Sequence, residues 1–508
     1  MTTQLAAFIC YFVVVLGIGL FFFFKSKGSG EKDYFLGGRA MGPWVTALSA
    51  QASDMSGWLL MGFPGSILAF GMGQVWIGIG LALGTMANWI FVARRLRKFS
   101  VAANDSITVP QYLSNRFLTQ SPALQIICAV VFLVFFTVYV ASSFVAGQTV
   151  FVQVVPQLAD KPEVALLIFA AIIIVYTFLG GFKAVCWTDF FQGLMMLVAL
   201  LAVPIILLGA QELDLSIFST ETAGDFDLNP FKADIKDILS GLAWGLGYFG
   251  MPHIIVRFMS AKSAKTLKKS ATIGIVWVVL TLGAAIAMAI LGHAYPATAE
   301  LVADGNQKLI FVVLAQKLFP PFIAGLLLSA IVAAAMSTAD SQLLVASSSF
   351  TSDIYKPIFR KKASDKEILW VGRIIVLIIA VIAYFIASSK SEGAQTIMTL
   401  VESAWGGFGA SFGPVIILSL FWKRFTYKGA IAGVVCGALT DILWLVFLSG
   451  SSPIIESFPN LVNDTGIYEL LPGFIVGAVS AVVVSLIDKK PSKEVEALFD
   501  KAVSSEIE

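Results

Sequence analysis

The chain has 508 residues, of which 58% are hydrophobic and only 13% are charged, and its mean hydropathy is +0.86. Soluble domains carry about a quarter charged residues, so this composition excludes an ordinary soluble protein and indicates a chain surrounded largely by lipid. A net charge of +2 gives no basic bias toward nucleic acid, and two isolated histidines with four cysteines in apolar runs suggest neither a metal enzyme nor a disulfide framework.

Apolar runs long enough to cross a bilayer recur along the chain. About 20 apolar residues span the hydrocarbon core, and runs of this length are too long for barrel strands, so each predicts a transmembrane helix. The first run follows no basic leader and precedes no small-residue cleavage site, so we expect a retained span rather than a signal peptide. The thirteen predicted spans are 4–24, 42–70, 74–93, 123–155, 163–180, 185–209, 237–258, 271–294, 309–348, 369–388, 396–421, 427–449 and 467–487.

The distribution of Lys and Arg assigns the sides of the membrane. With the N-terminus outside, the basic clusters fall in inner segments, including the one that begins at Arg257, and in the tail after Asp488. Only a small minority of the 34 Lys and Arg residues fall on the outer side, namely Lys161, Lys232, Lys236, Lys308, Lys317 and Lys390. A miscounted span would scatter this alternation, so we predict that the N-terminus is outside and the C-terminus inside.

The second predicted span breaks the rules of a membrane helix. Its segment 47–65 reads ALSAQASDMSGWLLMGFPG, with Asp54, Ser56 and Gly57 inside an apolar context. Clustered Ser, Asp and Gly are poor helix formers, and polar groups at membrane depth usually face a cavity or an ion path. We interpret the segment as a discontinuous helix that forms an ion and substrate site. A face of small residues for helix packing is the alternative, although packing alone does not require Asp54.

The ninth predicted span carries hydroxyls on one face. Ala334, Ser337, Thr338 and Ser341 follow helical spacing, so two adjacent hydroxyls and a backbone carbonyl one turn earlier suit half of a Na⁺ cage. Hydroxyls that bond back to their own helix are the alternative. Asp340 points elsewhere on the helical wheel, and its role stays open.

The seventh predicted span combines aromatic rings with helix breakers. Trp244, Tyr248 and Pro252 recur every four residues and predict a continuous stripe, while three glycines and the proline weaken the helix around it. Aromatic side chains beside an interrupted helix are suited to bind a compact apolar ring that bears a carboxylate. The ends of the two half-helices can bind the charge of that carboxylate. An aromatic belt at the membrane interface is the alternative.

Three smaller features complete the survey. Asp189 near the start of the sixth span is either a second cation site or a partner of Lys183, and Tyr139 lies within the fourth span. The glycine-rich segment 406–414 is either a flexible gate or a site of close helix packing.

At these segments the chain resembles the sodium/solute symporter family throughout its length, and most closely its bacterial sodium/proline branch. The strings that carry the resemblance are DYFLGGR (33–39), VTALSAQASDMSGWLLMG (45–62), WTD (187–189), WGLGYFGMPH (244–253), AAAMSTADSQLL (333–344) and WGGFGASFGPV (405–415). The string at 244–253 favours the proline branch over the sugar, iodide or sialate branches.

The resemblance implies an all-α polytopic membrane protein with a LeuT-like core of two inverted five-helix repeats among thirteen transmembrane helices. The expected organisation is an extra helix and first inner loop (1–41), a first repeat (42–209), an outer loop (210–236), a second repeat (237–422), two further spans (423–488) and an inner tail (489–508). No similarity between the two halves is visible in the sequence, so the repeat comes from the resemblance alone.

The resemblance also implies a sodium-coupled symporter that imports L-proline, with Na⁺ as the transported coupling ion and no organic cofactor. The implied Na⁺ ligands are the backbone carbonyls of Ala52, Met55 and Ala334 and the hydroxyls of Ser337 and Thr338, supported by Asp54. The implied proline contacts are Ser56, Gly57, Tyr139, Trp244, Tyr248 and Pro252, and Asp189 matches a position linked to cation coupling.

One departure is Asp340, which places a carboxylate just after the Ser-Thr pair, where proline members of the family vary. It is expected to affect either ion stoichiometry or release of the ion on the inner side. We expect a monomer in the bacterial cytoplasmic membrane, in contact with lipid, that binds no nucleic acid and is not an enzyme. A symporter of another small carboxylate or amino acid is the alternative, and a passive channel is a more distant one.

Overall fold

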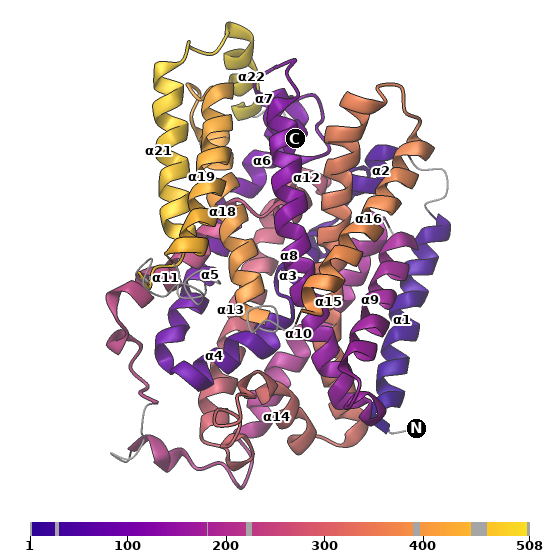
Figure 1. Ribbon diagram of the computed structural model, residues 1–508, viewed down its shortest axis with the longest axis vertical. Coiled ribbons are helices and arrows are strands. Elements are labelled where there is room, and N and C mark those ends of the chain that lie inside the picture. Colours follow the sequence, from indigo (N-terminus) through magenta and orange to yellow (C-terminus); the bar gives the residue numbers. More distant parts are fainter. Residues whose placement is uncertain are drawn as a thin grey trace.

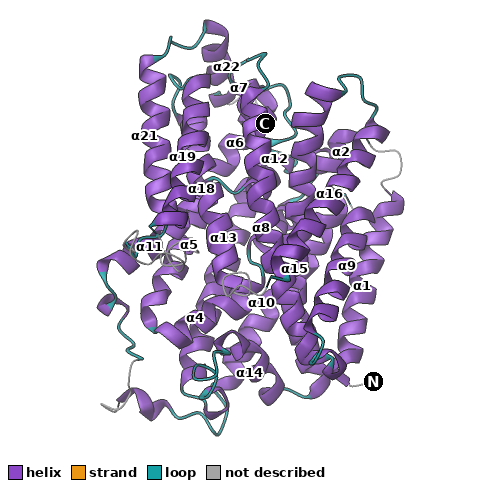
Figure 2. Cartoon of the chain, viewed as in Figure 1, coloured by secondary structure: helices purple, strands orange, loops and turns teal. Residues whose placement is uncertain are grey.

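The computed structural model describes residues 3–25, 30–179, 181–219, 226–389, 397–448 and 465–504, and its regular elements over these ranges are helices (Figure 2). The one strand-like feature in this part of the chain is an isolated parallel bridge between Met41 and Ala261. A bundle of helices is the expected result, because helices satisfy their own backbone hydrogen bonds inside a membrane.

Ten helical segments in the described ranges are long and apolar enough to cross a membrane, and a bent pair adds an eleventh if it is counted as one span. The ten contain α1 (Thr3–Lys25), α5 (Val75–Ala87) with α6 (Arg94–Ala102), α8 (Ala123–Val154), α10 (Phe182–Leu207), α13 (Ala264–His293), α15 (Pro321–Ser349), α16 (Asp365–Ala387), α18 (Ile397–Phe421), α19 (Tyr427–Phe447) and α21 (Leu470–Ile487). The bent pair joins α11 (Ile235–Ala243) and η8 (Trp244–Phe249) to α12 (Pro252–Ser260) at an angle of 41°.

Shorter helices occupy the remaining predicted spans. The second predicted span contains α3 (Pro43–Asp54), η2 (Trp58–Gly62) and α4 (Phe63–Phe70), and the fifth contains α9 (Pro162–Leu179). The expectation of a multi-pass helical membrane protein is therefore confirmed, at the level of ten or eleven apolar helices.

One predicted span is divided in the structure. The run 309–348 was expected to be a single helix, but it forms α14 (Ile310–Leu318) and the separate α15. Between them Phe319 has extended backbone, with φ −123° and ψ 150°, and two prolines follow it. Proline lacks a backbone donor and disfavours helix in the residue before it, so the apolar run cannot continue as one helix.

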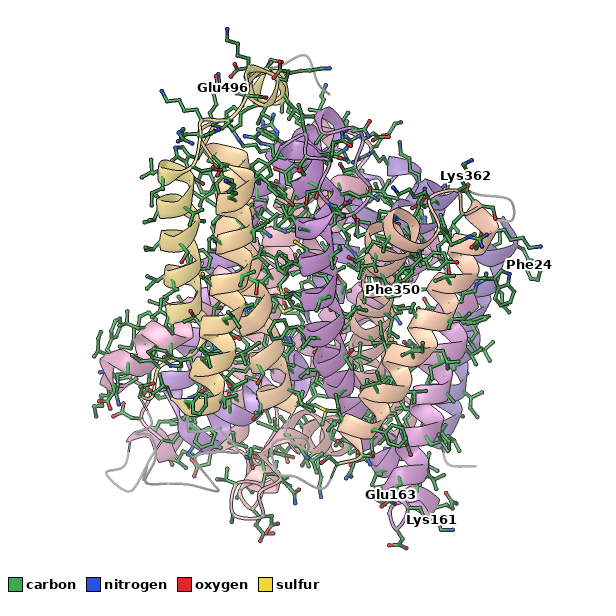
Figure 3. The ribbon with its side chains drawn as sticks, turned by 45° about the horizontal axis from the view of Figure 1, so that its top comes forward. Phe24, Lys161, Glu163, Phe350, Lys362 and Glu496 are labelled. Atoms are coloured by element: carbon green, nitrogen blue, oxygen red, sulfur yellow. The ribbon has the colours of Figure 1, made fainter. Side chains whose placement is uncertain are left out.

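The helices run roughly in parallel between two polar ends. Figure 1 shows the start of α1 at the lower end of the bundle and the C-terminal helix α22 (Lys493–Val503) at the upper end. In Figure 3 the side chains of Lys362 and Glu496 extend from one end, and those of Lys161 and Glu163 from the opposite end. The two ends of the chain therefore lie at opposite ends of the bundle.

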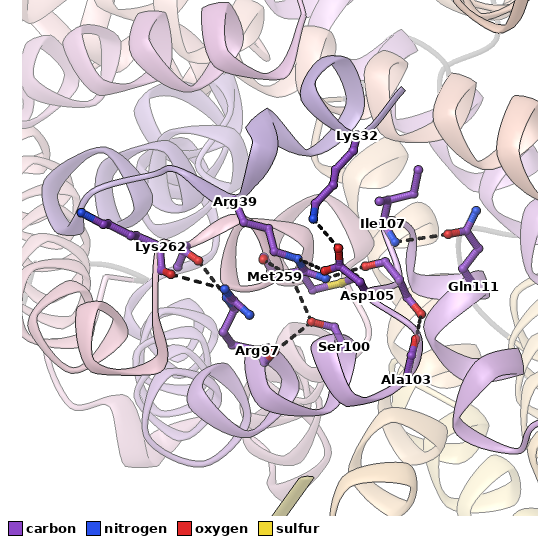
Figure 4. A network of polar contacts seen from close by, with 12 residues as sticks. Lys32, Arg39, Arg97, Ser100, Ala103, Asp105, Ile107, Gln111, Met259 and Lys262 are labelled. Atoms are coloured by element: carbon purple, nitrogen blue, oxygen red, sulfur yellow. Dashed lines mark hydrogen bonds and ion pairs between the residues drawn. The ribbon is translucent and has the colours of Figure 1, made fainter. Parts of the chain in front are cut away.

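At the upper end, a network that we call the Arg39 clamp joins three segments (Figure 4). The Arg39 guanidinium donates to Asp105 Oδ1 at 2.7 Å, to the Ser106 carbonyl at 2.8 Å and to Ser100 Oγ at 3.1 Å. It also donates to the carbonyl of Met259 near the end of α12. The clamp thus holds the connection before α3, the segment after α6 and the end of the bent pair together.

The carboxylate of the clamp is held in its charged form. Partial burial by itself would raise the pKa of Asp105, but the hydrogen bond from Lys32 and the nearby charge of Arg39 outweigh it and lower the pKa below its usual value. Because both charges come from the segment before α3, the ion pairs fix the position at which that helix enters the bundle.

Helix α15 lies in the middle of the bundle. Its residues are buried almost without interruption from Ala324 to Ser349, and it packs against α1, α3, α8, α10 and α16. A helix that is buried all round presents every face to a neighbouring helix. The hydroxyl face that carries Ser337 is thereby placed against α3.

Candidate functional site

Helix α3 ends inside the bundle. The α-helix runs to Asp54, and Met55 leaves helical geometry with φ −82° and ψ 80° before a π-helix begins at Trp58. Gly57 lies in this gap because a Cβ there would be 2.6 Å from the Cβ of Ala146 on α8. The predicted discontinuity is therefore present, and the unwound segment packs directly against α8.

Helix α15 meets α3 one turn before this break. Ser337 Oγ lies 2.7 Å from the carbonyl oxygen of Ala52 and 3.2 Å from that of Ala334. The neighbouring Thr338 hydroxyl is buried and has no hydrogen-bond partner among the described residues. Met55, the remaining expected ligand, is fully buried at the break itself. A hydroxyl and two carbonyl oxygens converge here beside an unpartnered hydroxyl, and such oxygens suit a hard alkali cation.

Asp54 connects the two broken helices. The Tyr248 hydroxyl donates to Asp54 Oδ2 at 2.6 Å, while Asp54 Oδ1 has no partner in the described part of the chain. Its backbone carbonyl accepts long contacts from Trp58 Nε1 at 3.4 Å and from the Tyr139 hydroxyl at 3.5 Å. Two of the predicted substrate residues, Tyr139 and Tyr248, therefore meet at the break next to Ser56 and Gly57.

The bent pair does not carry the predicted continuous stripe. Trp244 and Tyr248 lie on the 3₁₀-helix η8, and the chain then bends at Met251 before Pro252 opens α12. The prediction of one helical stripe through all three residues is wrong, because the glycines and the proline end the helix between the second and the third. Trp244 instead stacks on Tyr468, with ring centroids 5.1 Å apart.

Trp405 on α18 holds η8 in place. Its indole donates to the Trp244 carbonyl at 2.8 Å, and its ring meets that of Tyr248 edge to face at 5.0 Å. The glycine-rich segment around it is continuous helix in α18, where a Cβ on Gly409 would lie 2.8 Å from the Cα of Gly247. This geometry favours close packing as the reason for the glycines.

Arg257 forms a buried ion pair that was not predicted from the sequence. Its guanidinium donates to Asp189 Oδ2 at 3.1 Å, and both side chains are almost completely buried. The same group also donates to Ser49 Oγ at 3.1 Å and to Ser341 Oγ. One arginine on α12 thus connects α3, α10 and α15.

The same contacts bear on the predicted partner of Asp189. Arg257 lies inside α12 at 1% exposure, three residues before that helix ends at Ser260. The alternative that Asp189 pairs with Lys183 is wrong, because Lys183 pairs with Asp33 at 3.1 Å. The available signal was an arginine within the apolar run HIIVRFM, a position that requires a partner at depth.

Two further buried polar side chains lie close to the site. Asp340 is fully buried within electrostatic range of Asp189 and Arg257, and neither of its carboxylate oxygens has a described hydrogen-bond partner. The His253 ring lies edge-on to those of Phe136 and Tyr139, and both of its ring nitrogens are likewise unpartnered. A lone histidine in an apolar run carries no sequence signal for a place beside Tyr139.

Comparison with known proteins places this geometry in context. The family model described as the sodium:solute symporter family matches residues 34–437. The sodium/proline symporter of Escherichia coli is 43% identical over 508 residues, covering 99% of this chain and 96% of that protein. The osmoregulated proline transporter OpuE of Bacillus subtilis is 42% identical over 491 residues, covering 96% of each chain. The high-affinity proline transporter PutP of the same organism is 44% identical over 490 residues, covering 94% of this chain and 97% of that protein.

Two solved structures share the fold. A Na⁺-coupled sialic acid symporter in a substrate-bound outward-open state matches with a TM-score of 0.73 at 19% identity, covering 97% of this chain and 99% of that chain. Mhp1, a nucleobase-cation-symport-1 family transporter in a closed conformation, matches with a TM-score of 0.53 at 15% identity, covering 92% and 98%. Both are LeuT-fold-like transporters, so the arrangement of helices belongs to that type.

Proposed function

Because this chain belongs to the sodium:solute symporter family, we propose that it imports L-proline together with Na⁺ by alternating access. Membership confirms the family assignment made from the motifs, and with it the expectation of a sodium-coupled transporter rather than an enzyme. Proline is supported as the substrate by relatives named proline transporters, which match nearly the whole chain at 42 to 44% identity.

The observation that carries the proposal is the convergence of oxygens between α3 and α15. We propose that Na⁺ takes the place of the hydrogen bonds that Ser337 Oγ makes to the carbonyls of Ala52 and Ala334. The unpartnered hydroxyl of Thr338 would supply a further ligand. The proposed set is completed by the Met55 carbonyl, with Asp54 as the nearby negative charge.

Proline would bind next to this ion. Helix α3 ends at Asp54, after the proposed ligand Ala52 and directly before Met55, Ser56 and Gly57, so an ion that orders the break also orders that side of the substrate site. Tyr139 and Tyr248 reach Asp54 from α8 and η8, and Trp244 and Pro252 would complete the contacts. Each ligand would then raise the affinity for the other, as linkage requires.

Alternating access would follow from movement of the broken helices against their neighbours. The membrane potential supplies about 2.3 kcal/mol per charge per 100 mV, which together with an inward Na⁺ gradient drives accumulation of the amino acid. The Arg39 clamp would close the inner side in the present conformation. Asp189 and Asp340 are proposed to tune cation coupling from beside Arg257.

The finer architecture is part of the same proposal. We propose thirteen transmembrane helices with the N-terminus outside and the C-terminus inside, including two inverted five-helix repeats at 42–209 and 237–422. The opposite positions of α1 and α22 support an odd number of spans. The bacterial relatives support a place in the cytoplasmic membrane of a bacterium, where the protein would act as a monomer.

Transport by the purified protein in proteoliposomes tests the function. Labelled proline should accumulate against its gradient under an inward Na⁺ gradient, and replacement of Na⁺ by choline should abolish the accumulation. A panel of unlabelled solutes, containing other amino acids and small carboxylates, identifies the preferred substrate. Uptake that only equilibrates would indicate a channel, and stronger competition by another solute would replace proline as the substrate.

A further inference from the structure

Three acidic residues lie on or directly beside the helices α18, α19 and α21, which pack against one another. They are Glu402 on α18, Asp441 on α19 and Glu469 directly before α21. Asp441 is completely buried and Glu469 is 2% exposed. None of the three belongs to the proposed transport machinery, so their position requires another explanation.

Asp441 and Glu469 point at the same place on α18. A Cβ placed on Gly406 would lie 2.8 Å from Asp441 Oδ1 and 3.3 Å from Glu469 Cγ. The missing side chain of Gly406 therefore leaves the space in which the two acidic groups approach each other. Glu469 also lies within electrostatic range of Asp441 and of Glu402.

Asp441 and Glu469 lack the partners that buried charges normally have. Both carboxylate oxygens of Asp441 and Oε1 of Glu469 have no hydrogen-bond partner among the described residues. No salt bridge in the described ranges involves any of the three acids. Two buried carboxylates that reach the same position without a cationic partner cannot both stay charged in a low-dielectric site, so the pair requires a cation.

The surrounding groups favour a proton over a metal ion. The titratable group that faces the cluster is Tyr468, which interacts electrostatically with all three acids and donates to the Glu402 carbonyl at 2.9 Å. Lys236 on α11 is exposed and lies against Gly466. Within the described ranges no three His, Cys, Asp or Glu side chains have the geometry of a metal site.

We propose that Asp441 and Glu469 form a proton-binding site in which they share one proton, with Glu402 as a nearby third acid. Loss of this proton would make the two groups repel each other against Gly406 and loosen the packing of α18 on α19 and α21. Helix α18 also carries Trp405, whose indole holds the Trp244 carbonyl of η8. Trp244 itself stacks on Tyr468. Binding or loss of the proton would therefore affect Trp244, in the wall of the proposed proline site, through both Trp405 and Tyr468.

The site gives transport a sensitivity to pH on one side of the membrane. In the proposed orientation the start of α21 and the end of α19 face outward, so external protons would occupy the site. Transport would be faster with the proton bound, because the packing around Trp405 and Trp244 is then intact. This consequence for uptake rests on the proposed function, whereas the binding of the proton does not.

Infrared difference spectroscopy of the purified protein tests the binding directly. Between about pH 6 and about pH 9, well above the usual range of an Asp or Glu side chain, wild type should lose carbonyl absorption of a protonated carboxylic acid. Asp441→Asn, Glu469→Gln and the double variant should each change this loss, and Asp304→Asn, at an exposed aspartate in another loop, should not. An identical difference spectrum in wild type and all three variants would overturn the proposal, as would a transition that moves with Ca²⁺ concentration at fixed pH.

Uptake tests the consequence. With the internal pH buffered, raising the external pH from about 6 to about 9 should slow proline uptake by wild type about five-fold, the lower end of typical coupling between sites. The double variant should show no such dependence, and Asp304→Asn should behave as wild type. Equal pH dependence in wild type and the double variant would overturn the coupling. A wild type that transports no proline at either pH would refute the proposed function instead, and the infrared result would still decide whether the proton site exists.

Discussion

The Arg39 clamp and the site between the broken helices bury polar groups in opposite ways. In the clamp, Nε, Nη1 and Nη2 of Arg39 all donate to a described acceptor. At and beside the break, the Thr338 hydroxyl and Asp54 Oδ1 have no described partner. A buried polar atom left without a partner costs about 1–3 kcal/mol. The clamp, whose polar groups are paired, is therefore suited to hold helices in position. The site at the break, whose polar groups are unpaired, is suited to bind ligands.

The Arg257–Asp189 ion pair is intermediate between these two regions. Breaking it should cause the largest loss of stability. Arg257→Met leaves a buried carboxylate without its cation, which costs about 3–5 kcal/mol. Thermal unfolding in detergent should show the loss, and Arg257→Met combined with Asp189→Leu should recover most of it. Lys183→Met, which removes a half-exposed partner of Asp33, is the matched control. If this control lost as much stability as Arg257→Met, the assignment of Asp189 to Arg257 would fail.

Removing the hydroxyls at the unsatisfied site should chiefly affect transport. Ser337→Ala with Thr338→Ala should leave the fold intact and reduce Na⁺-stimulated uptake about 100-fold, because the proposed ion loses two of its ligands. The control is Ser347→Ala with Ser348→Ala on the same helix, whose hydroxyls bond only to their own helix, at 3.0 and 2.8 Å. Unchanged sodium dependence in the first variant would refute the proposed Na⁺ site between α3 and α15.

The link between the two broken helices should have a smaller effect. Tyr248→Phe removes the hydroxyl that donates to Asp54 at 2.6 Å and leaves this buried carboxyl group without its one described partner, which costs about 1–3 kcal/mol. Proline affinity should fall about 10-fold or more, measured as the apparent KM of uptake. Tyr384→Phe on α16 is a control for loss of a tyrosine hydroxyl elsewhere. An unaltered KM would show that the bond does not organise the substrate site.

The smallest effect is expected in the clamp. Asp105→Asn removes a partly exposed charge, which costs less than about 1 kcal/mol, while Arg39 keeps its contacts to Ser100, Ser106 and Met259. Since the pKa of folded Asp105 lies below its usual value, its contribution is present above the pKa of an unfolded aspartate and is lost as the pH falls through the folded value. Thermal unfolding of wild type and variant should therefore differ at neutral pH and converge in acid. If Asp105→Asn lost as much stability as Arg257→Met, the distinction between the partly exposed clamp and the buried ion pair would be contradicted.

The break in α3 could be predicted because its cause is local. Asp54, Ser56 and Gly57 interrupt an apolar run, and no tertiary contact is needed to see that such a helix is weak. The stripe through Trp244, Tyr248 and Pro252 failed for a related reason, because its spacing assumed the continuous helix that the same glycines and proline prevent. The division at Pro320 was missed because hydropathy alone set the bounds of that span.

The sequence by itself determined that this protein is a helical membrane bundle and where its helices are weak, because apolar length and helix propensity are properties of consecutive residues. Only the tertiary structure decided that Asp189 pairs with Arg257 rather than with Lys183, and that Asp441 and Glu469 meet at Gly406. These partners lie on different helices, and which faces of the helices touch depends on how all of them pack together. A periodic pattern along one helix shows that a face is polar, but it does not show what that face will meet.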